Sequence, residues 1–461
     1  MPPVHSRAAP VRDRHAINAG TASLEQMIAA RKLRKLRAAI VIKRQQIKAV
    51  LAATITGSNG QGPQAKKQRE EARFSWADHV RKMSEAQFKL RYRLDFDSFN
   101  LLLDILRPDV EARDVKMAKR AKWGYLIEPE AKLAMALRFL AGGSPLDLEL
   151  IYLVSKSYVY ACVWTVVDAI NKRLRVEFPV HDVEKLTVLE AEWRAKARCS
   201  GWKGQVAALD GVHFPTSAPG PKDVPDPMQY FVARKNEYAL LCMACCDADL
   251  RILDYDISQV PSTHDSLAFA VSPLGVKVAA GALPAPFFIN GDSAFALSNS
   301  LITPSGGRGP DFDAFDYHQS SNRVAIERAF GILIRRWAIL WKPIVVRFDR
   351  RAPLIGACIR LHNFCVDRRI EEETTSVAGL SEVQPGRYAK TPKFDKLGRP
   401  VRYLRIAKGQ PQRHPTGKGK EACTVTRDRL LRAVVACGIT RPPLSSGLQK
   451  KRRGGKRGQR T

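Results

Sequence analysis

The chain has 461 residues, 45% of them hydrophobic, so its length allows two or three domains with buried cores. It carries 76 Lys and Arg against 45 Asp and Glu, a formal net charge of +31. An uncharged apolar run of about 18 residues and a secretory signal are both missing from the pattern, so we expect a soluble intracellular protein without a membrane partner. The positive excess favours a polyanion partner, with nucleic acid ahead of an anionic membrane surface or a basic surface kept for solubility.

The cysteines are odd in number, and most lie in apolar runs, which predicts free thiols in a reducing compartment. Cys242 and Cys245 form a CxxC pair, but the pair lies in an apolar, strand-like run without a second pair of ligands at zinc spacing. A buried strand is therefore favoured over a metal or redox site. The nine cysteines are Cys162, Cys199, Cys242, Cys245, Cys246, Cys358, Cys365, Cys423 and Cys437.

Both ends of the chain differ in composition from the middle. Residues 1–70 contain the basic run RKLRKLR and a Gly-rich polar linker, and we expect a largely disordered basic arm. Residues 371–461 are polar and proline-rich and end in LQKKRRGGKRGQRT; we expect a basic, mostly disordered extension with one short helix at 427–437. Basic blocks of this kind favour nuclear import or phosphate contact, so a nuclear location is expected.

Residues 71–200 show a helical pattern, which predicts an all-helical domain. Apolar spacing predicts a helix that ends at Pro108, another that begins near Pro129, and a third that Ser144 caps. A turn at 154–157 then leads into a helix over 158–170, and a connecting helix follows at 183–199. Two helices joined by a short turn are typical of a helix-turn-helix, but an ordinary helical bundle predicts the pattern equally well.

Beyond residue 200 the pattern changes to short apolar runs. They predict strands at 205–210, 238–246, 251–257 and 286–292, with one more at 344–348. Helices are expected at 265–278, at 321–340 after a Gly-rich loop, and at 353–367. The mixed order of hairpin-linked strands, crossover helix and further strand fits an α/β fold with a ribonuclease H-like mixed sheet over residues 201–370.

Three acids can meet at one edge of such a sheet. Asp210 and Asp292 are expected at strand ends, beside Gly211 and after Gly291, and Glu327 lies next to the apolar stripe of a long helix. Oxygen ligands suit hard cations such as Mg²⁺ or Mn²⁺. Two such ions about 3.5–4 Å apart clamp the attacking and leaving oxygens of a phosphoryl displacement.

Each acid also has an ordinary structural explanation. An Asp-Gly pair such as Asp210-Gly211 is a common turn, Asp292 could cap a helix, and Glu327 could pair with Arg323 or Arg328. Periodicity alone does not select three acids out of 45. The sequence motifs around the three acids distinguish them from the other acidic residues.

Six sequence motifs, which follow one another along this chain, resemble those of the Harbinger (PIF/Harbinger) transposase-derived nucleases of the DDE endonuclease superfamily. The resemblance spans roughly residues 90–368, and the words are LDGVHFP, YFVARKNEYALLCMACCDADLRILDYDI, STHDS, GDSAFALSNSLITP, FDYHQSSNRVAIERAFGILIRRWAIL and IRLHNFCVD. It implies a DNA-cutting ribonuclease H-like domain that uses divalent metal, in which Asp210, Asp292 and Glu327 are the catalytic, metal-binding acids. It also implies a separate Myb/SANT-like DNA-binding partner.

The chain departs from the family words at a few places. DGVH stands where DGTH is commoner, PSTHDS lacks a Gly at its start, and the stretch after GDSAF lacks the usual Tyr-Pro. These departures spare the three acids, so loss of activity is not expected from them.

Other polar residues of the region are candidates for DNA contact. His213, downstream of Asp210 on the same strand, is expected to face the same side, where it contacts a phosphate or makes a structural hydrogen bond. Asp265 is expected to cap a helix or to serve the site, and His362 to be buried and satisfied. The basic candidates, each with a solvated or paired charge as its alternative, are Arg234, Lys235, Arg323, Arg328, Arg335 and Arg336.

The sequence therefore predicts a metal-dependent DNA endonuclease or transposase that is able to oligomerise. P-loop, GxSxG and HExxH motifs are not found, and nothing in the pattern indicates a nucleotide, haem or flavin cofactor. The alternative is a catalytically inactive, domesticated transposase that acts as a DNA-binding or recruitment protein. An RNA-binding protein is disfavoured, because the aromatic-rich words used for base stacking are not seen.

Overall fold

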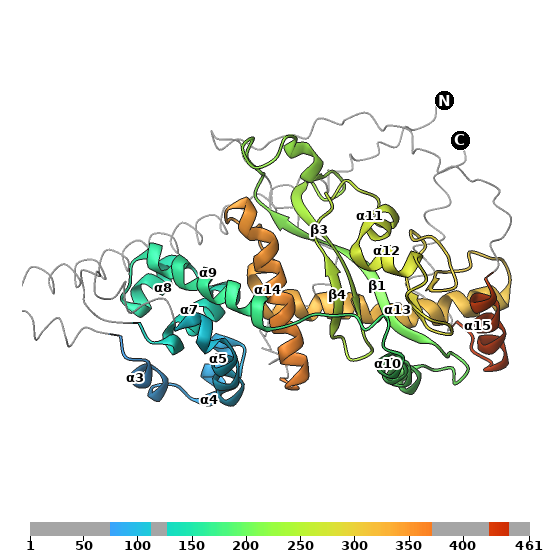
Figure 1. Ribbon diagram of the computed structural model, residues 1–461, viewed down its shortest axis with the longest axis horizontal. Helices are drawn as coiled ribbons and strands as arrows, with labels where there is room; N and C mark the ends of the chain where they lie inside the picture. Colours follow the sequence, from blue (N-terminus) through green and yellow to red (C-terminus); the bar gives the residue numbers. More distant parts are fainter. Residues whose placement is uncertain (1–73, 112–126, 371–423, 442–461) are drawn as a thin grey trace, which may run out of the picture. The chain divides into compact units, whose positions relative to one another are not determined.

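A computed structural model describes residues 74–111, 127–370 and 424–441 of the chain (Figure 1). The predicted basic arm at 1–70 lies outside these residues, as do Cys423, the terminal basic block and most of the predicted extension at 371–461.

The first part of the described chain is helical. Ser144 caps its helix by accepting the N–H of Leu146 at 3.2 Å, and Pro129 occupies a first-turn position, both as predicted. The helix predicted to end at Pro108 instead runs to Val110, because Val110 is buried and the backbone bonding continues. The helices are α3 (Trp76–Arg81), α4 (Glu85–Tyr92), α5 (Phe96–Val110), α7 (Pro129–Leu140), α8 (Pro145–Tyr152), α9 (Lys156–Arg173) and α10 (Val183–Lys196).

Helices α8 and α9 form a bent pair with an angle of 101° between them. This angle fits a helix-turn-helix. Helix α9 also packs against α5, α7 and α14 (Phe348–Asp367), as a bundle helix would. The structure thus satisfies both interpretations of this segment. In the described ranges no single helix has the length and apolar character to cross a membrane, although the bent pair does by those two criteria.

A six-stranded mixed sheet follows the helices. β1 is antiparallel to β3 and parallel to β5; β3 is antiparallel to β2 and β4, and β5 is parallel to β6. This order, with β1 in the middle, is consistent with the predicted ribonuclease H-like arrangement. The strands are β1 (Gln205–Thr216), β2 (Phe231–Val232), β3 (Glu237–Cys246), β4 (Ile252–Asp256), β5 (Phe288–Asn290) and β6 (Leu301–Ile302).

The two faces of the sheet belong to different hydrophobic clusters. Leu240, Cys242 and Ala244 of β3 lie in a cluster with side chains of α13 (Pro310–Arg336), α14 and the preceding helices, which we call the α13 face. Leu241, Met243 and Cys245 alternate with them and pack with α10, α11 (Asp265–Val271) and α12 (Pro273–Ala279), which we call the α11 face. Figure 1 shows β1 and β3 between these helices.

The α13-face cluster continues into α4, α5, α7, α8 and α9. The helices therefore share their core with the mixed sheet, and an independent helical domain ending near residue 200 stays a prediction.

The cysteines of β3 are completely enclosed. Cys242, Cys245 and Cys246 are at most 1% exposed, and burial raises the pKa of each thiol. The CxxC pair is therefore part of a buried strand, as predicted.

The structure corrects three expected elements. The strand predicted at 344–348 is absent among the described residues; Ile344 makes only an isolated bridge to Thr216, and the last strand is β6. Strand β6 was not predicted, because its two residues are too few to give a recognisable sequence pattern. The helix predicted at 321–340 begins at Pro310, because buried side chains continue upstream at helical spacing. The helix predicted at 265–278 is broken at Ser272, which ends α11 and caps α12 before Pro273.

The short helix expected near the C-terminus is α15 (Val425–Ala436). Its Leu430 and Val434 are buried in a cluster with Trp202, Phe288 and Phe315. The thiol of Cys199 also donates to the carbonyl of Ala433. This packing places α15 against α13 and beside Phe288 of β5.

Candidate functional site

Asp210 lies in the middle of β1 and not at its end. It pairs with Ala244 of β3, and the pairing continues to Thr216 opposite Tyr238. The sequence did not show this, because Gly211 and Pro215 read as strand breakers although cross-strand bonding overrides them. Its register partner belongs to the α13 face, so the carboxylate of Asp210 points toward α13.

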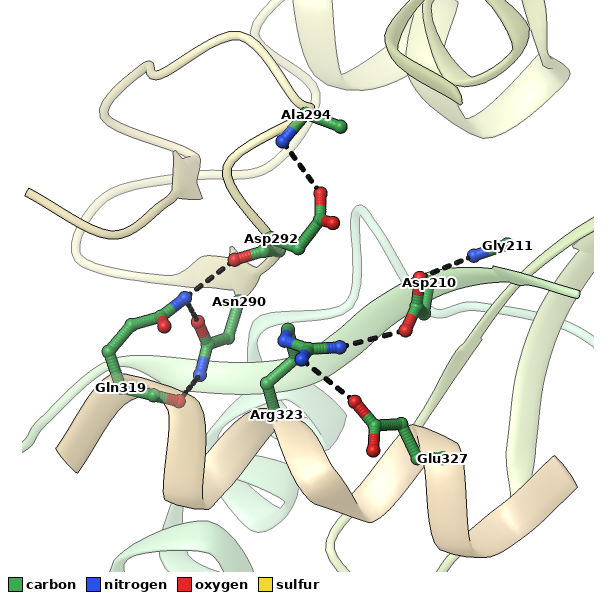
Figure 2. A network of polar contacts seen from close by, with 9 residues as sticks. Asp210, Gly211, Asn290, Asp292, Ala294, Gln319, Arg323 and Glu327 are labelled. Atoms are coloured by element: carbon green, nitrogen blue, oxygen red, sulfur yellow. Dashed lines mark hydrogen bonds and ion pairs between the residues drawn. The ribbon is translucent and has the colours of Figure 1, made fainter. Parts of the chain in front are cut away.

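Glu327 of α13 is joined to Asp210 through a single guanidinium (Figure 2). Nη1 of Arg323 donates to Oδ2 of Asp210 at 2.8 Å, and Nη2 donates to Oε1 of Glu327 at 2.8 Å. Arg323 precedes Glu327 by one helical turn, so the pairing expected as the structural alternative for Glu327 is present. Two of the three predicted acids thus share one cation.

Asp292 lies beyond β5, on the loop that leaves the sheet. Its carboxylate accepts the N–H of Ala294 at 2.8 Å and, as Figure 2 shows, is turned away from Arg323. No helix begins there, so this is a local Asx turn and not the helix cap considered from the sequence.

A buried amide pair fixes the backbone beside Asp292 to α13. The side-chain N–H₂ of Gln319 donates to Oδ1 of Asn290 at 2.6 Å and to the carbonyl of Gly291 at 2.5 Å. Asn290 donates a hydrogen bond to the backbone carbonyl of Gln319 at 3.0 Å (Figure 2). Both side chains are fully buried. Sequence analysis missed this pair; the available signal was a polar Asn inside the apolar run PFFIN.

The electrostatics of Asp210 connect all three acids. Burial raises the pKa of Asp210 to about 6; the N–H of Gly211 and the charge of Arg323 oppose this, whereas Asp292 and Glu327 add to it. The carboxylates therefore repel one another and favour a positive charge between them.

This donor set fits a hard divalent cation in its chemistry. Within the residues that the structure describes, no three His, Cys, Asp or Glu side chains converge closely enough to hold a metal ion. The candidate ligands are nonetheless all carboxylate oxygens, and a cationic group already lies between two of them.

His213 lies on the opposite face from Asp210, contrary to expectation. His213 pairs with Leu241 of the α11 face. Side chains alternate between the two faces along a strand, and an odd number of positions separates His213 from Asp210. Burial lowers the pKa of His213, and the charges of Lys235 and Arg234 lower it further. These three residues thus form a basic cluster, which we call the hairpin cluster because Arg234 and Lys235 lie in the β2–β3 turn.

The remaining candidates separate into exposed and structural groups. Arg328 is exposed on α13, whereas Arg336 is 7% exposed and donates to the carbonyl of Ile370, so its side chain is structural. His264 rather than Asp265 caps α11, since its Nδ1 accepts the N–H of Ser266. His362 is buried and bonds the carbonyl of Leu250 at 2.8 Å, as predicted, and burial lowers its pKa to about 4.

Residues 209–363 match the model of a family described as DDE superfamily endonuclease. The matched region is about a third of the chain and contains Asp210, Asp292, Arg323 and Glu327. No curated protein and no solved structure matches the chain significantly. The match supports the DDE endonuclease superfamily and a transposase-like nuclease domain, with DNA as the substrate such a domain implies. The Harbinger subfamily stays a prediction.

Proposed function

We propose that this protein is a metal-dependent DNA endonuclease or transposase of the Harbinger type, in which Asp210, Asp292 and Glu327 hold two divalent ions, Mg²⁺ or Mn²⁺. The observation that carries the proposal is the guanidinium of Arg323, which Asp210 and Glu327 share. The two acids come from a central strand and a neighbouring helix, inside the region matched by the endonuclease family.

Each acid has a different support in the fold. Asp210 is held by the paired strands β1 and β3, and Glu327 by a helix whose Ile326 and Leu333 are completely buried. Asp292 lies on a loop, but the amide pair ties the preceding Gly291 to α13. Bound divalent ions would supply an activated water or DNA hydroxyl and neutralise charge at the phosphate. Rigid supports keep such ligands in position during the reaction.

Metal-dependent nicking of supercoiled plasmid DNA tests the proposal. The wild-type protein is expected to nick the plasmid with Mn²⁺ and to lose this activity when EDTA is added, whereas Asp292→Asn is inactive under all conditions. Equal nicking by the two proteins would remove Asp292 from the site. If neither nicks DNA, even with a Myb/SANT-like partner added, while both bind it, the recruitment function takes the place of the nuclease.

The hairpin cluster supplies positive charge for the DNA backbone. Replacing both Arg234 and Lys235 with Gln is expected to weaken DNA binding and to lower the slope of log K against log salt by about 2, because each phosphate contact contributes about one unit. Fluorescence anisotropy over a salt series measures this slope. The double variant Arg81→Gln with Lys82→Gln removes the same charge at the C-terminal end of α3, outside the matched region, and serves as control. A slope that stays at the wild-type value in the Arg234, Lys235 double variant would exclude the cluster from the DNA interface.

The nuclear location of the protein and its association with a partner protein are proposals that rest on the sequence alone. The basic blocks support import into the nucleus, and the resemblance supports a separate DNA-binding partner.

A further inference from the structure

The guanidinium of Arg323 lies between two of the acids proposed as metal ligands, Asp210 and Glu327. It uses two of its nitrogens on two different carboxylates, both at 2.8 Å, and its side chain is only 17% exposed. Its positive charge is permanent, because arginine does not lose its proton in proteins. It is therefore a fixed counter-charge inside an acidic cluster.

Placing a second positive charge beside the guanidinium of Arg323 is electrostatically unfavourable. A divalent ion bound by Asp210 and Glu327 would compete with Arg323 for the same oxygens and would repel its guanidinium at close range. The carboxylate of Asp292, turned to Ala294, would also have to rotate toward the ion. Binding of the metal therefore includes the cost of breaking these contacts.

We propose that Arg323 is a built-in counter-cation of the metal-free protein, which must release Asp210 and Glu327 before a divalent ion binds. This inference rests on the proposed function of the site and adds its regulation: Arg323 stabilises the acid cluster by neutralising its charge and lowers its affinity for metal. A different role for Arg323 makes the opposite prediction. If it only orients Asp210 for the ion, removing it weakens metal binding.

Isothermal titration of the full-length protein with Mn²⁺ alone, without DNA, separates these roles. Arg323→Gln is expected to bind Mn²⁺ about tenfold more tightly than the wild type, since removing one like charge near a cation is worth roughly one unit of log K. The same variant is expected to be less heat-stable than the wild type without metal and to recover more stability when Mn²⁺ is added.

Arg328→Gln is the matched control, because it removes the same charge from an exposed position on the same helix. It is expected to change the Mn²⁺ affinity less than twofold. Arg323→Lys keeps the positive charge but lacks the planar guanidinium that contacts both carboxylates. Its Mn²⁺ affinity is therefore expected to lie between those of the wild type and Arg323→Gln. This variant carries the test if Arg323→Gln does not fold.

The outcomes distinguish the inference from the function on which it rests. Unchanged or weaker Mn²⁺ binding by Arg323→Gln, with normal binding by the wild type, overturns the inference alone. If the wild type binds no Mn²⁺ but Arg323→Gln does, the inference is supported. If neither variant of Arg323 nor the wild type binds Mn²⁺, both the inference and the proposed metal site are wrong.

Discussion

Asp210→Asn is expected to lower the rate of Mn²⁺-dependent DNA cleavage by about 10³-fold or more. A carboxylate that holds a catalytic ion contributes several kcal/mol to the transition state, and each 1.36 kcal/mol is tenfold in rate. Asparagine keeps the size of the side chain and an oxygen but loses the negative charge. Single-turnover cleavage of a labelled duplex measures the rate, and anisotropy checks that DNA affinity is preserved.

Asp254→Asn provides a close control for this substitution. Asp254 lies on β4 of the same sheet, and burial raises its pKa to about 6, as it does for Asp210. It pairs with Cys245, so it belongs to the α11 face, away from Arg323 and Glu327. Cleavage at the wild-type rate is expected for Asp254→Asn. Similar losses in both variants would mean that sheet stability, and not metal binding, limits activity.

Gln319→Ala is expected to destabilise the protein and to impair cleavage together. It removes the two bonds from Gln319 to Asn290 and Gly291 and leaves two buried oxygens without a donor, which costs about 2–3 kcal/mol. Because Asp292 directly follows Gly291, its loop loses its anchor on α13. Misplacement of a reacting group by about 1 Å can cost about 10²-fold in rate, so a loss of that size is expected.

Urea unfolding and single-turnover cleavage measure the two effects of Gln319→Ala separately. The control is Ser320→Ala, at the neighbouring exposed position of α13. It is expected to leave both quantities unchanged. A destabilised Gln319→Ala protein that cleaves DNA at the wild-type rate would show that the amide pair supports the fold without positioning Asp292.

The sequence by itself determined the local features of this protein. Apolar runs marked β3 and most of β5, small polar residues marked the caps of helices such as α8, and the words around Asp210, Asp292 and Glu327 selected those acids. Such features depend on residues close together in the chain, where propensity and periodicity act. The family match bears out the DDE superfamily for the region that contains them.

Only the tertiary structure decided how the selected residues meet. The continuation of β1 past Gly211 depends on pairing with β3, and that pairing places Asp210 and His213 on opposite faces. The fork of Arg323 between Asp210 and Glu327 exists only because α13 packs over β1. The bonds between Asn290 and Gln319 join residues 29 positions apart. Each is a contact between separate elements, whose geometry depends on packing and is not encoded in the local pattern of either segment.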